Sequence, residues 1–152
     1  MKKLLTALVV SSVLAGCATG ARVSEAQRLE MYRQMAGAPV ESFRYLGTIQ
    51  GWTPLGDEAL VVRAGVNQSY LLELMGTCPE LDFATAISIS NQMGRVYARF
   101  DTVRPLGGMP GPNIPCRIGQ IRPVDARAVR EAEREMRDQV EVVERDQEAG
   151  GT

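Results

Sequence analysis

The sequence contains no histidine, and both of its lysines lie among the first three residues. Histidine is the usual general base and metal ligand near neutral pH, and lysine is the residue that forms Schiff bases. After Lys3 the only basic side chains are 15 arginines, and they stand against 18 carboxylates, a net charge near −3. Because nucleic-acid binding requires a basic patch that neutralises several phosphates, we expect no nucleic-acid partner.

Motifs for cofactor chemistry are also missing. The chain has only three cysteines, at positions 17, 78 and 116, and none of them forms a C-x-x-C pair. No histidine is present to complete a zinc-binding pattern, and no glycine-rich phosphate loop occurs. We therefore expect no metal, no cofactor and no enzymatic activity.

The first 16 residues have the organisation of a secretory signal. Lys2 and Lys3 precede an apolar run, residues 4–13, that is much shorter than the roughly 20 residues a membrane-spanning helix needs. The run closes with Leu-Ala-Gly-Cys at 14–17, which resembles the lipobox of bacterial lipoproteins. This resemblance implies cleavage before Cys17, acylation of that residue and a short tether over residues 17–23.

The lipid anchor predicts where the protein resides. Two or more acyl chains hold a protein at a membrane essentially permanently, whereas a single chain gives only marginal binding. Residue 18 is Ala, and in Gram-negative lipoproteins an Asp at this position usually means retention in the inner membrane. We therefore expect an outer-membrane protein that faces the periplasm, with the membrane as its first partner.

With Cys17 acylated, Cys78 and Cys116 remain in an oxidising compartment, where two thiols normally join. We predict a disulfide between them. Closing a loop of roughly 40 residues contributes about 3 to 5 kcal/mol in the chain-entropy estimate.

The folded part is short enough for one domain, because cleavage leaves 136 of 152 residues. Ser24 and Gln27 fit a capping box, which predicts a helix over 24–37 that Gly37 and Pro39 end. Period-two alternation then predicts about six strands in a β-rich domain over 40–124, at 41–49, 59–64, 69–75, 87–89, 96–100 and 116–122.

These elements predict an α+β fold, an antiparallel sheet that curls into a small barrel or half-barrel, and we favour the closed barrel because closure removes exposed edges. Residues 65–68 are expected to form a hairpin turn, and 79–84 are expected to form one helical turn. Ile118 and Ile121 break strict alternation, and a bulge at Gly119 would return both to the core.

Two features are candidate binding elements. Residues 104–115 contain three glycines and four prolines and are expected to form a long loop, with Arg104, Met109 and Asn113 as possible contacts. Trp52 is expected to fold from a turn onto the core, although an indole on a turn can also stack on a sugar or anchor a partner. A plain surface loop is the alternative for 104–115.

The C-terminal segment predicts an amphipathic helix over 125–148, capped by Asp125 and about 35 Å long. Its apolar stripe is narrow, and Glu133 with Arg137 and Glu141 with Arg145 have i,i+4 spacing. The helix either packs on its own domain, or forms a coiled coil, or docks on a partner protein. The stripe consists of Val129, Ala132, Met136, Val140 and Val143.

A hydrolase without histidine would need a pair of carboxylates, as glycosidases use. Glu80, Asp82 and Asp101 are the best candidates. Carboxylates at strand ends are more often solvated or paired with arginine, here Arg99 or Arg122, so we expect a structural role.

Several motifs together resemble a family of small Gram-negative lipoproteins known as a domain of unknown function. The resemblance covers most of 40–124, leaves out the terminal helices and implies a fold but no activity. We therefore expect a non-enzymatic envelope module that serves structure or protein interaction, with a ligand or glycan binder and a carboxylate hydrolase as alternatives. The motifs are Phe43-x-Tyr45, Gly51-Trp52, Tyr70-Leu71-Leu72, the cysteine pair and C-R-I-x-x-I-R-P at 116–123.

Overall fold

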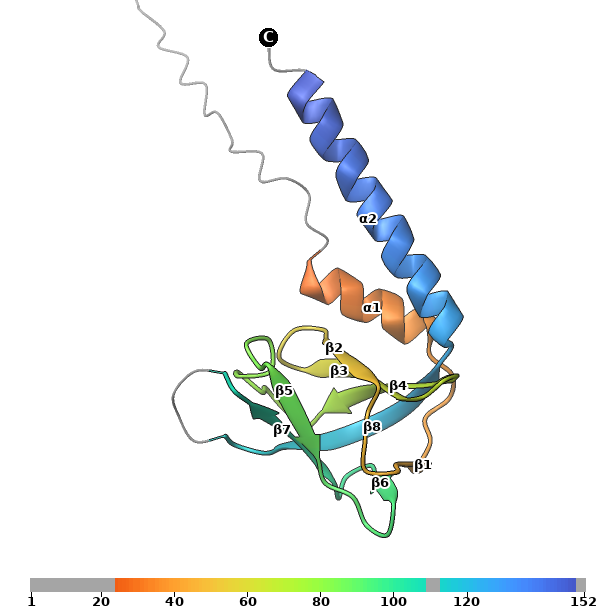
Figure 1. The fold of residues 1–152 in the computed structure, drawn as a ribbon, viewed down its shortest axis with the longest axis vertical. Coiled ribbons are helices and arrows are strands. Elements are labelled where there is room, and N and C mark those ends of the chain that lie inside the picture. The colour runs from red at the N-terminus through yellow and green to blue at the C-terminus, as the bar shows by residue number, and fades with distance from the viewer. Residues whose placement is uncertain (1–23, 109–112, 150–152) are drawn as a thin grey trace, which may run out of the picture.

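The computed structural model describes residues 24–108 and 113–149 (Figure 1). Its fold is α+β, as expected, with a curled antiparallel sheet. One helix precedes the sheet along the chain and the other follows it. The leader, the lipobox with Cys17 and the tether all fall outside the described residues. The elements are α1 Glu25–Met35, β1 Ser42–Arg44, β2 Gly51–Pro54, β3 Ala59–Gly65, β4 Gln68–Leu74, β5 Ala86–Ile89, β6 Arg95–Tyr97, β7 Thr102–Leu106, β8 Cys116–Val124 and α2 Ala126–Ala149.

The main sheet has six strands in the order β2-β3-β4-β8-β7-β5, and β1 pairs separately with β6. Its outer strands, β2 and β5, are not neighbours in the described sheet, so it is a curled half-barrel and the closed barrel that we favoured is wrong. Neither helix of the described part is both long and apolar enough to span a bilayer.

Helix α1 begins where the sequence predicts. The Ser24 hydroxyl accepts a hydrogen bond from the Gln27 backbone N–H, and the Gln27 side chain accepts one from the Ser24 N–H, which completes the capping box. Leu29 and Tyr32 are its buried residues. The backbone becomes extended at Ala36, so the helix ends at Met35, two residues before the expected Gly37.

The centre of the sheet is buried on both faces. Its inner face carries the barrel cluster, and its outer face is covered by the helices, as Figure 1 shows for α1. The barrel cluster consists of Phe43, Tyr45, Leu60, Val62, Leu72, Cys78, Leu81, Ile89, Val96, Val103, Ile118 and Ile121. The helix cluster consists of Leu29, Tyr32, Leu55, Ala59, Val61, Leu71, Val124 and Val129.

The β3–β4 hairpin and the bulge in β8 are confirmed. Val66 and Asn67 connect the two strands of the hairpin. In the β4–β8 ladder, Glu73 pairs with Gln120 but Leu74 pairs with Ile118, so Gly119 is the extra residue. The bulge leaves Ile118 and Ile121 fully buried.

The first expected strand, 41–49, is interrupted. β1 ends at Arg44, and Gly47 takes a left-handed conformation with φ of +87°, which bends the chain before β2 begins at Gly51. Phe43 and Tyr45 are nevertheless buried, as the alternation predicts. Trp52 therefore lies on a strand, paired with Val62, and its expected position in a turn is wrong.

The segment expected as a loop begins with a strand. β7 extends through Arg104 and Pro105 to Leu106 and pairs with β5. Because β7 pairs with β8 only at Thr102 and Val103, its later residues have one free side, which tolerates a proline without an N–H. Residues 79–84 also differ from expectation, since they form two successive turns rather than a helical turn.

Helix α2 is capped as predicted. The Asp125 carboxylate accepts hydrogen bonds from the N–H groups of Arg127 and Ala128, at 2.7 and 3.4 Å. Val129, in the first turn, is buried in the helix cluster. Figure 1 shows the later turns extending past α1 and away from the sheet, so the helix does not pack on its own domain along its whole length.

Candidate functional site

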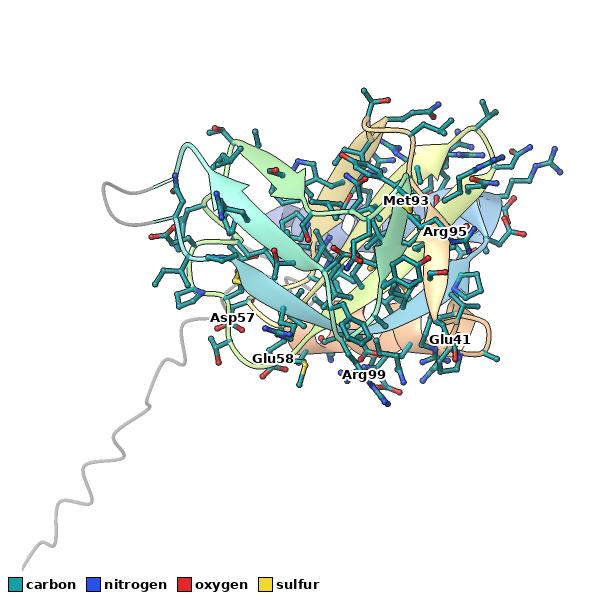
Figure 2. The ribbon with its side chains drawn as sticks, turned by 90° about the horizontal axis from the view of Figure 1, so that it is seen from below. Glu41, Asp57, Glu58, Met93, Arg95 and Arg99 are labelled. Atoms are coloured by element: carbon teal, nitrogen blue, oxygen red, sulfur yellow. A yellow bond between two sulfur atoms is a disulfide. The ribbon has the colours of Figure 1, made fainter. Side chains whose placement is uncertain are left out.

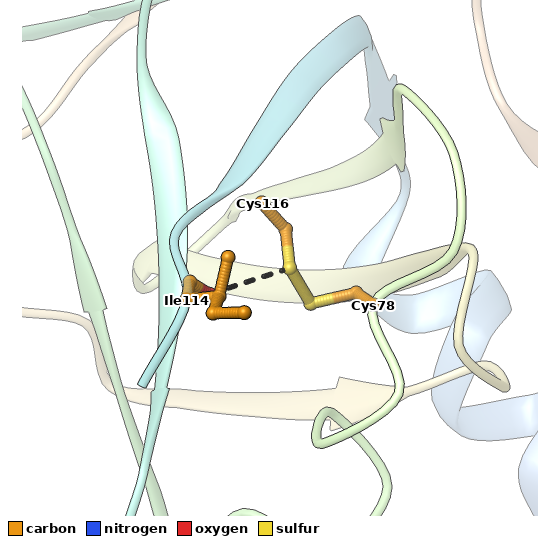
Figure 3. Close-up of a disulfide and its surroundings, with 3 residues drawn as sticks. All are labelled: Cys78, Ile114 and Cys116. Atoms are coloured by element: carbon orange, nitrogen blue, oxygen red, sulfur yellow. Dashed lines mark hydrogen bonds between the residues drawn. A yellow bond between two sulfur atoms is a disulfide. The ribbon is translucent and has the colours of Figure 1, made fainter. Parts of the chain in front are cut away.

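The disulfide between Cys78 and Cys116 is confirmed, and it joins the turn after β4 to the start of β8 (Figure 3). The two Cα atoms are 5.9 Å apart. The Ile114 carbonyl oxygen lies 3.7 Å from the Cys116 sulfur, a contact rather than a hydrogen bond because a disulfide sulfur carries no proton. The bridge therefore holds the end of the 104–115 segment against the turn at 78–81.

A pocket of about 390 Å³ lies beside the disulfide. The residues that line it are largely apolar, and the side chains of two of them, Met75 and Ile114, are more than half exposed. Glu80 and Arg117 supply its charged groups. Of the residues predicted as contacts in this segment, Arg104 lies exposed on β7, Asn113 is exposed next to Ile114, and Met109 falls outside the described residues.

Trp52 lies at a different place. It is half-buried against the barrel cluster and lines a pocket of about 40 Å³ together with Arg130 and Glu133 of α2. Neither Arg104 nor Asn113 lines this pocket. The structure therefore does not bring the predicted aromatic contact and the predicted binding loop together.

Asp101 is a buried structural carboxylate in the turn between β6 and β7. It accepts hydrogen bonds from the Ser90 hydroxyl and from the Tyr97 N–H, each at 2.7 Å. The expected arginine partners are wrong, because Arg122 instead donates to the backbone carbonyls of Ala36 and Gly37.

The turn that Asp101 holds was missed by the sequence reasoning. Arg99 has a φ of +69°, in the left-handed region that non-glycine residues rarely adopt. Phe100 lies on the strand expected over 96–100, but β6 ends at Tyr97 and Phe100 is 71% exposed, so that end of the expected strand is wrong. Its place in the period-two pattern gave no signal of the turn, because the turn depends on the distant Ser90 and Ile118.

Glu80 and Asp82 lie in the turns after the disulfide. Burial raises the pKa of Asp82, and the nearby negative charge of Asp57 raises it further. Among the described residues no hydrogen bond connects Glu80 or Asp82 with Asp101, whose carboxylate is occupied at another turn. Nor does any group of three or more cysteine or acidic side chains in this part of the chain stand ready to hold a metal ion.

The base of α2 is fastened to α1 by one polar contact. The Tyr32 hydroxyl donates a 2.8 Å hydrogen bond to Glu133, and burial, with the carboxylate as a second cause, raises the pKa of this phenol well above its usual value. Glu133 is thus bonded to Tyr32, whereas Glu141 pairs with Arg145 at 2.8 Å as expected. Val129 is the buried member of the predicted stripe, and the side chains of Val140 and Val143 lie outside the described part.

The family of the chain follows from comparison with known proteins and families. No curated protein and no solved structure matches the chain. A family model does match, and it covers residues 1–140, which extends the expected 40–124 to residues 1–39, including α1, and to most of α2. The chain belongs to this family, DUF6491, a family of unknown function.

Proposed function

We propose that the chain is a non-enzymatic, lipid-anchored lipoprotein of the outer membrane that faces the periplasm and binds a partner protein through the later turns of α2. The observation that carries the interaction is the position of this helix. Among the side chains of α2 that the structure describes, Val129 in the first turn is the one in the helix cluster, and Figure 1 shows the later turns running free of the sheet.

The exposed length of α2 supports a binding role. A helix of 24 residues is about 36 Å long. Charged residues on the face opposite the stripe, such as Asp138 and Arg145, are exposed. A surface helix with one apolar stripe and one charged face gains most of its stability from packing that stripe against something. Met136, half-buried, is the described stripe residue furthest from the base.

Two observations from the sequence support the anchor. The lipobox at 14–17 ends in Cys17, and Ala18 follows it. The family match begins at residue 1 and therefore includes this leader. Replacing Cys17 by Ser should leave an unprocessed precursor or a soluble protein, as measured by intact mass and membrane fractionation. A wild-type protein that carries no lipid and fractionates as soluble would contradict the anchor.

Site-specific photo-crosslinking in intact cells tests the interaction. A photoreactive residue at Met136, on the stripe, should join α2 to a discrete protein partner. The same residue at Asp138, on the opposite face two positions away, is the matched control and should give no such product. Equal crosslinking at both positions, or none at either, would contradict a partner on the stripe.

A further inference from the structure

A third pocket, remote from the later turns of α2, lies at an opening along one edge of β8. On one side of the opening the Arg99 N–H donates to the Ile118 carbonyl at 2.7 Å. On the other side the Val40 N–H donates to the Ile121 carbonyl at 2.8 Å. Gly119 and Gln120 lie between these contacts and line a pocket of about 390 Å³. This volume is at the lower end of the range for small-molecule sites, about 300 to 1,000 Å³.

The turn at the rim of this pocket is held in a strained conformation. Arg99 has a positive φ, and its backbone is fixed from both sides, because its carbonyl accepts a 3.0 Å hydrogen bond from Arg117. The buried Asp101 carboxylate fixes the next part of the turn through Ser90 and Tyr97. A left-handed backbone is unfavourable for a non-glycine residue and persists where surrounding contacts determine it, often at binding sites.

The strained turn presents two side chains outward at the pocket. Phe100 is 71% exposed, so it adds nothing to the barrel cluster, and Arg99 is exposed beside it. Pro39, Val40, Tyr97 and Ala98 complete the apolar part of the lining. The hydrogen-bonded turn holds the backbone of the aromatic residue and of the arginine in place, which reduces the entropy cost of binding.

The pocket carries one charge of each sign. Glu41 also lines it, next to the Arg99 turn, because its carbonyl accepts a 2.9 Å hydrogen bond from the Ala98 N–H, and Figure 2 shows Glu41 and Arg99 at the same edge of the molecule. In the described part of the chain, neither side chain forms an ion pair or a hydrogen bond. A guanidinium binds a carboxylate through two parallel hydrogen bonds, and a carboxylate binds an ammonium group.

We propose that this pocket binds a zwitterionic ligand of the size of an amino acid or a dipeptide. Arg99 binds the ligand carboxylate, Glu41 binds its ammonium group, and Phe100 packs against its apolar side chain. The site is independent of the α2 interaction, since none of its lining residues belongs to either helix.

Isothermal titration calorimetry on the full chain in detergent micelles tests the ligand class. The probe is the dipeptide alanyl-phenylalanine, and its N-acetylated and C-amidated forms each lack one charge. Because a hydrogen bond to a charged group is worth roughly a factor of ten or more, each blocked form should bind at least about tenfold more weakly. Absence of binding by the free dipeptide, or equal binding by all three forms, would overturn the proposal.

Two variants assign the charges to residues. Arg99→Asn keeps a residue that tolerates the left-handed backbone and should abolish the preference for a free carboxylate. Glu41→Gln should abolish the preference for a free amine. The matched controls are Arg44→Gln and Glu58→Gln, which change exposed residues outside the pocket and should leave both preferences intact.

A variant at Phe100 and a neutral sugar provide two further tests of the site. Circular dichroism establishes that each variant is folded, and Phe100→Ala gives a second test because the ring is exposed and its loss leaves no cavity. It should weaken binding of alanyl-phenylalanine more than that of alanyl-glycine. Tighter binding of a neutral sugar such as N-acetylglucosamine, or full preferences in both charge variants, would overturn the zwitterion site.

Discussion

The β3–β4 hairpin and helix α2 are built in opposite ways. In the hairpin both faces are covered, since Leu72 packs in the barrel cluster and its neighbour Leu71 in the helix cluster, and both are fully buried. In α2 Val129 is buried at the base, whereas Val142 near the other end is 52% exposed. The hairpin thus buries its apolar side chains within the domain, whereas α2 leaves an apolar side chain exposed to solvent.

Because of this difference, we expect the hairpin to determine the stability of the domain and the later turns of α2 to determine its binding. Burying a leucine completely stabilises a fold by about 2 kcal/mol, so the hairpin contributes strongly to the domain. An exposed pair such as Glu141 with Arg145 contributes only about 0.3 to 0.5 kcal/mol. Changes in the hairpin should therefore alter folding, whereas changes in the later turns of α2 should alter binding.

Removing the disulfide should have the largest effect on the covered region. The Cys78→Ala and Cys116→Ala double variant releases a loop with a sequence separation of 38 residues, and the chain-entropy estimate gives a loss of about 4 kcal/mol. Urea denaturation followed by circular dichroism measures this change in the free energy of unfolding. A loss below about 1 kcal/mol would show that the domain is held by its clusters alone.

Leu71→Ala should lower the free energy of unfolding by about 3 kcal/mol, because it leaves a cavity between the sheet and α1. The matched control is Val142→Ala in α2, which should change the free energy of unfolding by less than about 0.5 kcal/mol. Both values come from the same urea denaturation. Equal losses would mean that the later turns of α2 are as well packed as the hairpin, which would remove the contrast between the two regions.

A substitution at Tyr32 tests the hydrogen bond that joins α1 to the base of α2. Tyr32→Phe removes the hydrogen bond to Glu133 and should lower the free energy of unfolding by about 1 kcal/mol. Tyr97→Phe is the control, because the described residues offer its hydroxyl no hydrogen-bond partner. Thermal denaturation of the two variants side by side decides the matter, and equal melting temperatures would show that the hydroxyl does not fasten α2.

The smallest effect should come from Asp82. Its pKa is raised in the folded state, so the folded protein binds this proton more tightly than the unfolded chain, and stability falls as the pH rises above about 4. Asp82→Asn should therefore stabilise the domain slightly at pH 7 and leave it unchanged near pH 3. The side chain is exposed, so the gain should be only a few tenths of a kcal/mol.

Features set by neighbouring residues were predictable from the sequence. The capping box of α1, the cap at Asp125 and the turn at Val66 and Asn67 each depend on residues within a few positions of one another. The bulge at Gly119 was also predictable, because only an extra residue there returns both isoleucines to one face. The disulfide followed from having two thiols left after the lipobox cysteine.

Features set by distant residues were not predictable. Phe100 continues an alternating pattern, yet the turn that exposes it depends on hydrogen bonds from Ser90 and to Ile118. β7 extends through Pro105 because β5 pairs with it on one side only, which no local pattern indicates. The combination of Glu41 and Arg99 in one pocket likewise arises from segments that are far apart in the chain.

The hydrogen bonds from Arg122 to Ala36 and Gly37 have a mechanical consequence. They fasten the segment after α1 to β8. Asp125 is the one residue that links the end of β8 to the start of α2. If lipids hold the chain before α1 and a partner pulls on α2, the force meets at β8 before it reaches the rest of the sheet. β8 is also the strand with the long ladder to β4, whose hydrogen bonds share such a load. The fold can therefore transmit tension between its two ends while the outer strands carry little of it.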